Sequence, residues 1–175
     1  MIWQYTKRAD KAAAKIADRH YSRQKPGTDQ FTPPGRVLVL TTKKYDAVWA
    51  TSWPYSEYVN RVYPDAWLNS LFRNEGDYLA SDLITEAISA TKWFSINKWN
   101  SSKPPESGMI TLIDTKKVKP IKRRGSLHYG YVYEKAGFKH VGFTEGGLMI
   151  FQLLPEDMPE PKPINNCQLS LKLCF

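Results

Sequence analysis

The chain has 175 residues, of which 42% are hydrophobic and 24% are charged, and its formal net charge is +8. This length suits one globular domain with its own core, and no apolar run reaches the roughly 18 residues of a membrane helix. The first residues also lack the apolar stretch and small-residue cleavage site of a secretory signal. These features predict a cytoplasmic protein and argue against a membrane protein.

The excess of basic residues is the most informative of these totals. A protein of this size with 25 Lys and Arg against 17 Asp and Glu attracts polyanions. DNA and RNA are favoured over a membrane surface because no basic amphipathic helix is evident, and a solvated basic surface without a partner is the alternative. The two cysteines, Cys167 and Cys174, lie near the C-terminus, and with three scattered histidines they exclude a zinc cage.

The first 35 residues predict a strand, a helix and a loop. Residues 2–5 are a candidate edge strand. Residues 7–18 are rich in alanine, a strong helix former, and their apolar positions fall on one stripe. That stripe comprises Ala9, Ala13, Ile16, Ala17 and His20. Residues 22–35 contain too much Pro and Gly for regular structure.

The middle of the chain predicts a meander followed by a covering helix. Residues 36–41, 47–53 and 66–73 are rich in β-branched and aromatic residues and are bounded by turn residues. From Leu79 to Thr91 the apolar residues recur at helical spacing, which predicts an amphipathic helix over a sheet.

The last third predicts a central strand, a short helix and a hairpin. After a loop at 97–107, residues 108–114 form a near-continuous apolar run, typical of a buried strand. A basic stretch leads to a helix at 129–136, and Gly137 suits the C′ position, where φ is positive. Residues 139–144 and 148–154 then form a hairpin around a Gly-Gly turn.

Together these elements predict an α/β protein with a mixed central sheet and helices on both faces. Residues 1–155 are expected to form the domain and residues 156–175 a C-terminal tail. The tail ends in alternating leucines, which would suit either an extra strand or a loosely attached peptide: Leu169, Leu171 and Leu173.

The end of the predicted domain carries a resemblance to a known family. The segment Tyr133-Glu134-Lys135-Ala136-Gly137-Phe138 and its hairpin resemble the end of the Gcn5-related N-acetyltransferases, and the element order over residues 2–154 is similar to theirs. Residues 19–22, 72–76 and 111–114 resemble a phage-associated branch of that fold, the Mom-type proteins. Those proteins modify adenine in phage DNA and so block host restriction. The resemblance implies an acyl-CoA N-acyltransferase-like catalytic domain over residues 1–155.

A donor site is expected where the turn after residue 73 enters the helix. Backbone N–H groups and the helix dipole favour an anion there, and an arginine adds a planar donor fork. We expect phosphates of an acyl-CoA-type donor to meet Arg73, Asn74, Gly76 and Ser81. The turn lacks the (Q/R)-x-x-G-x-(G/A) loop of the acetyltransferases. The alternative is that Glu75 pairs with Arg73 and the turn merely starts the helix.

Four residues are candidate catalytic groups. His20 is either a core histidine or a neutral imidazole that acts as a base or metal ligand, and Tyr21 is a proton donor or stacking platform. Asp114 follows the central strand, where ligands collect in open α/β sheets, so it is a candidate general base unless it only starts a turn. His20 and Asp114 would supply part of an Fe²⁺ site. The resemblance implies that Tyr133 protonates a departing thiolate; otherwise it is a core aromatic residue.

Basic residues beside these groups predict affinity for a phosphate backbone. Six of them follow the central strand closely, two lie in the loop at 22–35, and one starts the strand after that loop. The alternative is that they form only a solvated surface. They are Lys116, Lys117, Lys119, Lys122, Arg123, Arg124, Arg23, Lys25 and Arg36. Trp49 and Trp53 share a strand face and are weaker candidates for stacking on a base.

The leading hypothesis is an enzyme that transfers a small acyl-type group to a nucleobase amine, with adenine favoured, in double-stranded DNA. Such a modification would protect phage DNA from restriction. Two alternatives remain: a conventional acetyl-CoA-dependent N-acetyltransferase acting on a protein or small amine, and a phage protein that binds DNA without catalysis. A homodimer is considered with each of them.

Overall fold

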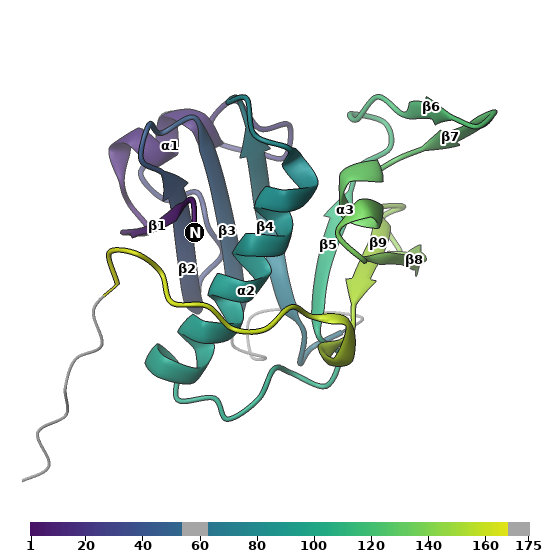
Figure 1. The fold of residues 1–175 in the computed structure, drawn as a ribbon. Coiled ribbons are helices and arrows are strands. Elements are labelled where there is room, and N and C mark those ends of the chain that lie inside the picture. The colour runs from purple at the N-terminus through teal and green to yellow at the C-terminus, as the bar shows by residue number, and fades with distance from the viewer. Residues whose placement is uncertain (54–62, 168–175) are drawn as a thin grey trace, which may run out of the picture.

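The computed structural model describes residues 1–53 and 63–167 (Figure 1). Its main feature is a seven-stranded sheet in which β4 and β5 are parallel and every other neighbouring pair is antiparallel. In spatial order the strands are β1 (Trp3–Thr6), β2 (Arg36–Thr42), β3 (Ala47–Trp53), β4 (Trp67–Asn74), β5 (Met109–Ile113), β9 (Met149–Leu153) and β8 (Lys139–Phe143). The prediction of a mixed α/β protein is confirmed.

Helices lie on both faces of this sheet because side chains alternate along its strands. Leu40 and Trp49 point to one face and pack against α2 (Ala80–Lys98). Val39 and Val48 point to the other and pack against α1 (Lys11–Ala17). The third helix, α3 (Tyr131–Lys135), joins the α2 face through Tyr133.

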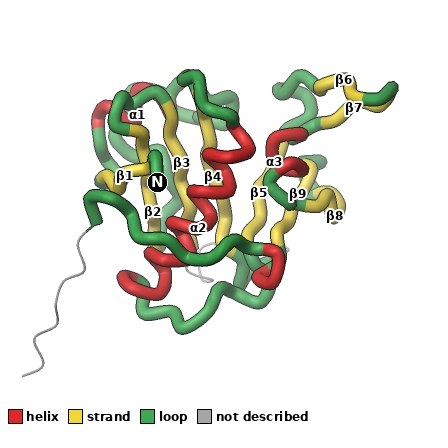
Figure 2. The backbone as a smooth tube through the Cα atoms, in the orientation of Figure 1, coloured by secondary structure: helices red, strands yellow, loops and turns green. Residues whose placement is uncertain are grey.

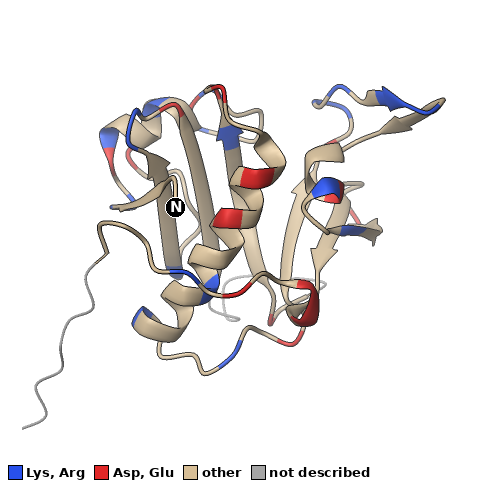
Figure 3. Cartoon of the chain, in the orientation of Figure 1, with Lys and Arg blue, Asp and Glu red and all other residues tan. Residues whose placement is uncertain are grey.

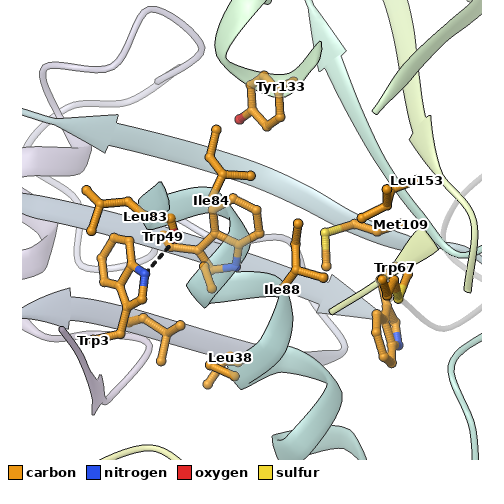
Figure 4. Close-up of a cluster of buried hydrophobic side chains, with 14 of the residues drawn as sticks. Trp3, Leu38, Trp49, Trp67, Leu83, Ile84, Ile88, Met109, Tyr133 and Leu153 are labelled. Carbon is orange, nitrogen blue, oxygen red and sulfur yellow. Dashed lines mark hydrogen bonds between the residues drawn. The ribbon is translucent and has the colours of Figure 1, made fainter. Parts of the chain in front are cut away.

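The larger core lies between the sheet and α2. Trp3, Trp49, Ile84 and Ile88 are fully buried in it (Figure 4). The Trp3 indole N–H donates to the Leu83 carbonyl at 2.8 Å, so the edge strand β1 is bound to the helix as well as to β2. Among the described residues, no helix has the length and apolarity needed to cross a membrane.

The bounds of α1 and α2 differ from those predicted. The first was expected over 7–18, but the Asp10 carboxylate accepts the Ala13 N–H at 2.8 Å and caps the helix, so α1 begins at Lys11 and Ala9 is exposed. The second runs seven residues past Thr91, because Phe94 continues its buried face. The predicted loop at 97–107 therefore begins too early.

The basic stretch contains a hairpin that the sequence did not predict. Strands β6 (Ile121–Arg123) and β7 (Ser126–His128) pair antiparallel and form a ribbon separate from the main sheet. Each has only three residues, too few to establish a period of two, and the Arg124-Gly125 turn is not one of the usual hairpin dipeptides.

The segment after the 3-10 turn at Pro155–Asp157 packs along α2 (Figure 1). Met158 and Ile164 are buried in the larger core. Asn166 bonds both backbone groups of Tyr5, accepting from its N–H at 2.6 Å and donating to its carbonyl at 2.9 Å. Residues 158–167 thus help to cover α2 and β1. The predicted alternation at Leu169, Leu171 and Leu173, like Cys174, lies outside the described residues.

Candidate functional site

The parallel strands β4 and β5 diverge along their length. They pair only from Trp67↔Met109 to Asn69↔Thr111, although β4 continues to Asn74 and β5 to Ile113. In Figure 2 their separation widens toward the ends that lie near α3. A sheet cannot be closed by hydrogen bonds where its strands separate, so side chains and pockets occupy this part of the fold.

Two pockets meet at this divergence. The inner pocket, of about 210 Å³, lies on the α2 and α3 face and is lined by Phe72, Thr111 and Tyr133 among others. The loop pocket, of about 830 Å³, lies on the α1 face and is lined by residues of the 22–33 loop and by Asp114. Alternation along β5 contributes to this division: Thr111 and Ile113 line only the inner pocket and Asp114 lines only the loop pocket, whereas Leu112 lines both.

Tyr21 lies between the two pockets. It lines both of them, and its hydroxyl donates to the carbonyl of Leu112 on β5 at 3.3 Å. Asn69 and Ser70, where β4 leaves β5, also line both pockets. Burial raises the pKa of the Tyr21 phenol, which therefore keeps its proton at neutral pH.

His20 lines the inner pocket from the turn that follows α1. Its Nδ1 lies 2.7 Å from the Ser22 hydroxyl oxygen, and its ring centroid is 4.4 Å from that of Tyr21. Burial, followed by the nearby charge of Arg73, lowers the pKa of His20 to about 4. The imidazole is therefore neutral at pH 7, and the lowered pKa also makes it a weaker base than an exposed histidine.

Tyr133 reaches the inner pocket from α3 but is committed to a hydrogen-bond network. Its hydroxyl donates to Asn69 Oδ1 at 2.6 Å, and the Asn69 amide donates to the carbonyls of Ala50 and Leu71, both at 3.0 Å. Burial raises the pKa of Tyr133, which makes the phenol a weaker acid. This geometry suits positioning of Asn69 better than release of a proton.

Gly130 allows α3 to approach β5 closely. It has a φ of +70°, and a Cβ there would lie 2.4 Å from the Ile113 Cδ1 atom and 3.2 Å from the Phe151 ring. Only glycine adopts this conformation readily, so the residue before α3 contributes to the placement of Tyr133.

Asp114 lines the loop pocket but also fulfils its alternative role as a turn residue. Its carboxylate accepts the Lys116 N–H at 3.0 Å and lies 3.8 Å from the Lys117 ammonium. His20 lines the other pocket. No group of three or more His, Cys, Asp or Glu side chains suited to a metal occurs within residues 1–53 and 63–167. This donor set does not fit an Fe²⁺ site, which would need further protein ligands.

The expected donor turn is occupied by its own charges. Glu75 accepts from Arg19 Nε at 2.7 Å and from Arg73 Nε at 2.5 Å, and these bonds, the one from Arg19 most, lower the pKa of Glu75 to about 2. A Cβ on Gly76 would lie 2.8 Å from an Asp46 carboxylate oxygen. An anion at this turn would meet two carboxylates and an arginine that is already paired.

The other expected donor ligands also have local roles. Asn74 accepts from the Gly76 N–H at 3.0 Å and donates to the Tyr78 carbonyl at 2.7 Å, and the Ser81 carbonyl accepts from Thr85. Neither residue lines the inner or the loop pocket. This turn does not fit the diphosphate of coenzyme A, and its side chains hold the turn itself together ahead of α2.

Two of the predicted phosphate ligands are structural. Arg23 donates to Asp18 at 2.6 Å and to the carbonyls of Thr28 and Gln30, and its side chain is 6% exposed, so it organises the 22–30 loop. Arg36 donates to the Trp99 carbonyl at 3.1 Å and stacks on Trp53, outside both pockets.

The two tryptophans proposed for stacking lie elsewhere. Trp49 is fully buried in the larger core, with its indole N–H donating to Thr51 at 2.5 Å. Trp53 packs near Trp99, with ring centroids 6.3 Å apart. Neither lines the inner or the loop pocket.

The remaining predicted cations lie at the pockets, in the turn after β5 or on the β6–β7 ribbon, which carries basic residues in Figure 3. Lys25 and Lys117 line the loop pocket, and Lys119 lines the inner pocket. Lys116 is exposed in the turn after β5. The others lie on the β6–β7 ribbon or its turn: Lys122, Arg123 and Arg124.

Asn69 is the residue that the sequence interpretation missed. It is 2% exposed and links β3, β4 and α3 at the point where the two pockets meet. Asparagine is depleted in strands, so its presence in Trp67-Leu68-Asn69-Ser70-Leu71 was a usable signal.

Searches against protein-family models, curated proteins and solved structures found no match to this chain.

Proposed function

We propose that this chain is a DNA-modifying transferase with a Gcn5-related N-acetyltransferase-like fold, which moves a small acyl-type group to a nucleobase amine. The observation that carries the proposal is the meeting of two pockets from opposite faces of the sheet where β4 and β5 diverge. A transfer reaction needs two substrates held next to each other, and two pockets that meet between β4 and β5 would hold them in this way.

The topology supports the fold assignment. A single parallel pair lies inside an otherwise antiparallel sheet. After β5 the chain forms the β6–β7 ribbon and a short helix and then enters a hairpin that pairs β9 with β5. The sequence resemblance covers the same region, from Tyr133 to the hairpin.

The inner pocket suits a nucleobase. Phe72, Tyr131 and Tyr21 offer aromatic side chains, and bases bind by stacking on such rings. Lys119 and the basic ribbon stand beside it, where the phosphate backbone of DNA would lie.

The loop pocket suits the donor. Its volume of about 830 Å³ is that of a site for a small molecule, for which roughly 300–1,000 Å³ is usual. Lys25 and Lys117 would favour an anionic donor. Because the Arg73 turn does not fit coenzyme A diphosphate, we leave the donor at the level of an activated acyl compound, such as a thioester.

The reaction follows from the groups where the two pockets meet. The amine nitrogen attacks the acyl carbonyl carbon, a C–N bond forms, and the bond from that carbon to its carrier breaks with the electron pair leaving on the carrier. The neutral His20 imidazole accepts the proton that the nitrogen loses. Tyr21, between the two pockets, orients the acceptor, and Tyr133 holds Asn69 in place.

Nucleoside mass spectrometry of plasmid DNA tests this function. DNA from cells that express the chain should contain an acylated nucleoside, and the His20→Gln variant should lose it. His140→Gln is the matched control, since His140 is an exposed histidine on β8 outside both pockets. An unmodified nucleoside profile with folded wild-type protein present would refute the proposal.

A further inference from the structure

The β6–β7 ribbon projects from the body of the protein (Figure 1). Every residue from 121 to 127 is exposed. At its tip Arg124 and Gly125 have φ values of +47° and +81°, as a tight two-residue hairpin turn requires. A Cβ added to Gly125 would meet no atom within 4 Å, so the tip stands in open space.

The ribbon is strongly cationic. Between Asp114 and Glu134 the sequence contains no acidic residue and six basic ones. Within the described ranges no salt bridge is made by the three basic residues of the ribbon and its turn, Lys122, Arg123 and Arg124. No described carboxylate neutralises their charge, although the Arg123 guanidinium lies over the Tyr131 ring, 5.6 Å from its centroid.

The two faces of the ribbon differ. Ile121 is opposite His128, and both line the inner pocket, so one face looks toward that pocket. Lys122 is opposite Leu127, which places these two on the other face. Leu127 is 63% exposed, and an apolar side chain so exposed between cations has no role in the core.

We propose that the β6–β7 ribbon enters a groove of duplex DNA and that Leu127, on the ribbon face that does not line the inner pocket, is a wedge that unstacks the base pair it contacts. This inference rests on the proposed function, because it takes DNA as the substrate. It adds the element that engages the duplex and the side chain that unstacks a base pair.

Three physical arguments support the partner and the role. The major groove of B-DNA, about 12 Å wide, admits a two-stranded β-ribbon, whereas the deep and narrow major groove of duplex RNA does not. Proteins that bind the minor groove unstack base steps with inserted apolar side chains such as leucine, so an exposed leucine can act on a base stack. The foot of the ribbon lines the inner pocket through Lys119, Ile121 and His128, so a base displaced at the ribbon has the pocket beside it.

The test measures binding and base unstacking separately. The probe is a DNA duplex that contains 2-aminopurine in a mismatch, because a mismatched base is extruded at low cost and the target sequence need not be known. Unstacking of the probe base raises its fluorescence, and anisotropy of a dye on the same duplex reports binding. Wild-type protein should bind and raise the 2-aminopurine emission.

The wedge is tested with Leu127→Ser against Val141→Ser, an exposed apolar residue of β8 away from the ribbon. Leu127→Ser should bind within about threefold of wild type but lose most of the emission increase, and Val141→Ser should keep both. Replacing Lys122, Arg123 and Arg124 together by alanine should weaken binding at least tenfold. It should also reduce the slope of log K against log salt by about 2.7, since each phosphate contact contributes about 0.9.

The possible failures point to different claims. If wild-type protein binds no DNA, or binds duplex RNA more tightly, the proposed function is wrong together with the ribbon's role. If DNA binds and is acylated but Leu127→Ser keeps the full emission increase, only the wedge is wrong. If the triple alanine variant binds like wild type, the ribbon is not the DNA-binding element, whatever the enzyme does.

Discussion

Replacing Tyr133 by phenylalanine removes one hydroxyl from the centre of the site and keeps the ring that packs with Phe72 and Phe138. The lost bond is the one to Asn69 Oδ1, at 2.6 Å and fully buried. A typical buried hydrogen bond contributes about 1 kcal/mol, and leaving its acceptor unsatisfied costs roughly 1–3 kcal/mol. We therefore expect Tyr133→Phe to lower the free energy of unfolding by about 1–3 kcal/mol.

Urea denaturation followed by circular dichroism measures this change. The matched control is Tyr131→Phe, because Tyr131 is only half-buried in the same helix and should change stability by less than about 0.5 kcal/mol. A Tyr133→Phe protein as stable as wild type would show that the network does not hold Asn69 in place.

The same variant separates the two roles considered for this phenol. If Tyr133 positions Asn69, the variant should keep part of its DNA-modifying activity, and Asn69→Leu should remove about as much activity as the two changes combined. If Tyr133 is the acid that the family resemblance implies, Tyr133→Phe should abolish activity while Asn69→Leu retains some of it.

Three further predictions concern pH, the loop and the turn before α3. Because the pKa of His20 is lowered to about 4, below the usual 6.5 of the unfolded chain, stability should fall as pH drops from about 6.5 toward 4, and His20→Gln should flatten that dependence in denaturation curves. Arg23→Ala removes the ion pair with Asp18, whose carboxylate keeps the Gly27 N–H as a donor, so the free energy of unfolding should drop by about 1–3 kcal/mol. Limited proteolysis should then cut the 22–30 loop, and an intact loop would contradict this. Gly130→Ala should lower the melting temperature of the protein more than Gly125→Ala. An alanine at either position must adopt a positive φ, which costs about 1–2 kcal/mol, but only the alanine at 130 also clashes with its neighbours. Equal effects would argue against the close packing of α3.

The sequence predicted most elements because their signals are local. The strand at 47–53 has the bounds that the structure shows, and Gly137 has a φ of +95°, as its predicted place after the last helix requires. The start of α1 and the β6–β7 ribbon were missed for equally local reasons, a capping Asp10 and strands too short to show a period. Side-chain patterns over four or more residues are thus enough to recognise an element but not to define its ends.

What the sequence alone determined about this protein is its class, its positive charge and the order of most of its elements, because these depend on composition and on periods of two or 3.6 residues. The tertiary structure decided which functional candidates meet. Tyr133 and Asn69 are 64 positions apart, and Arg19 reaches Glu75 across 56, so both contacts depend on strand pairing and register. The pairing of β4 with β5 ends at Asn69 and Thr111, and the two pockets meet beyond that point. His20 lines one of these pockets and Asp114 lines the other.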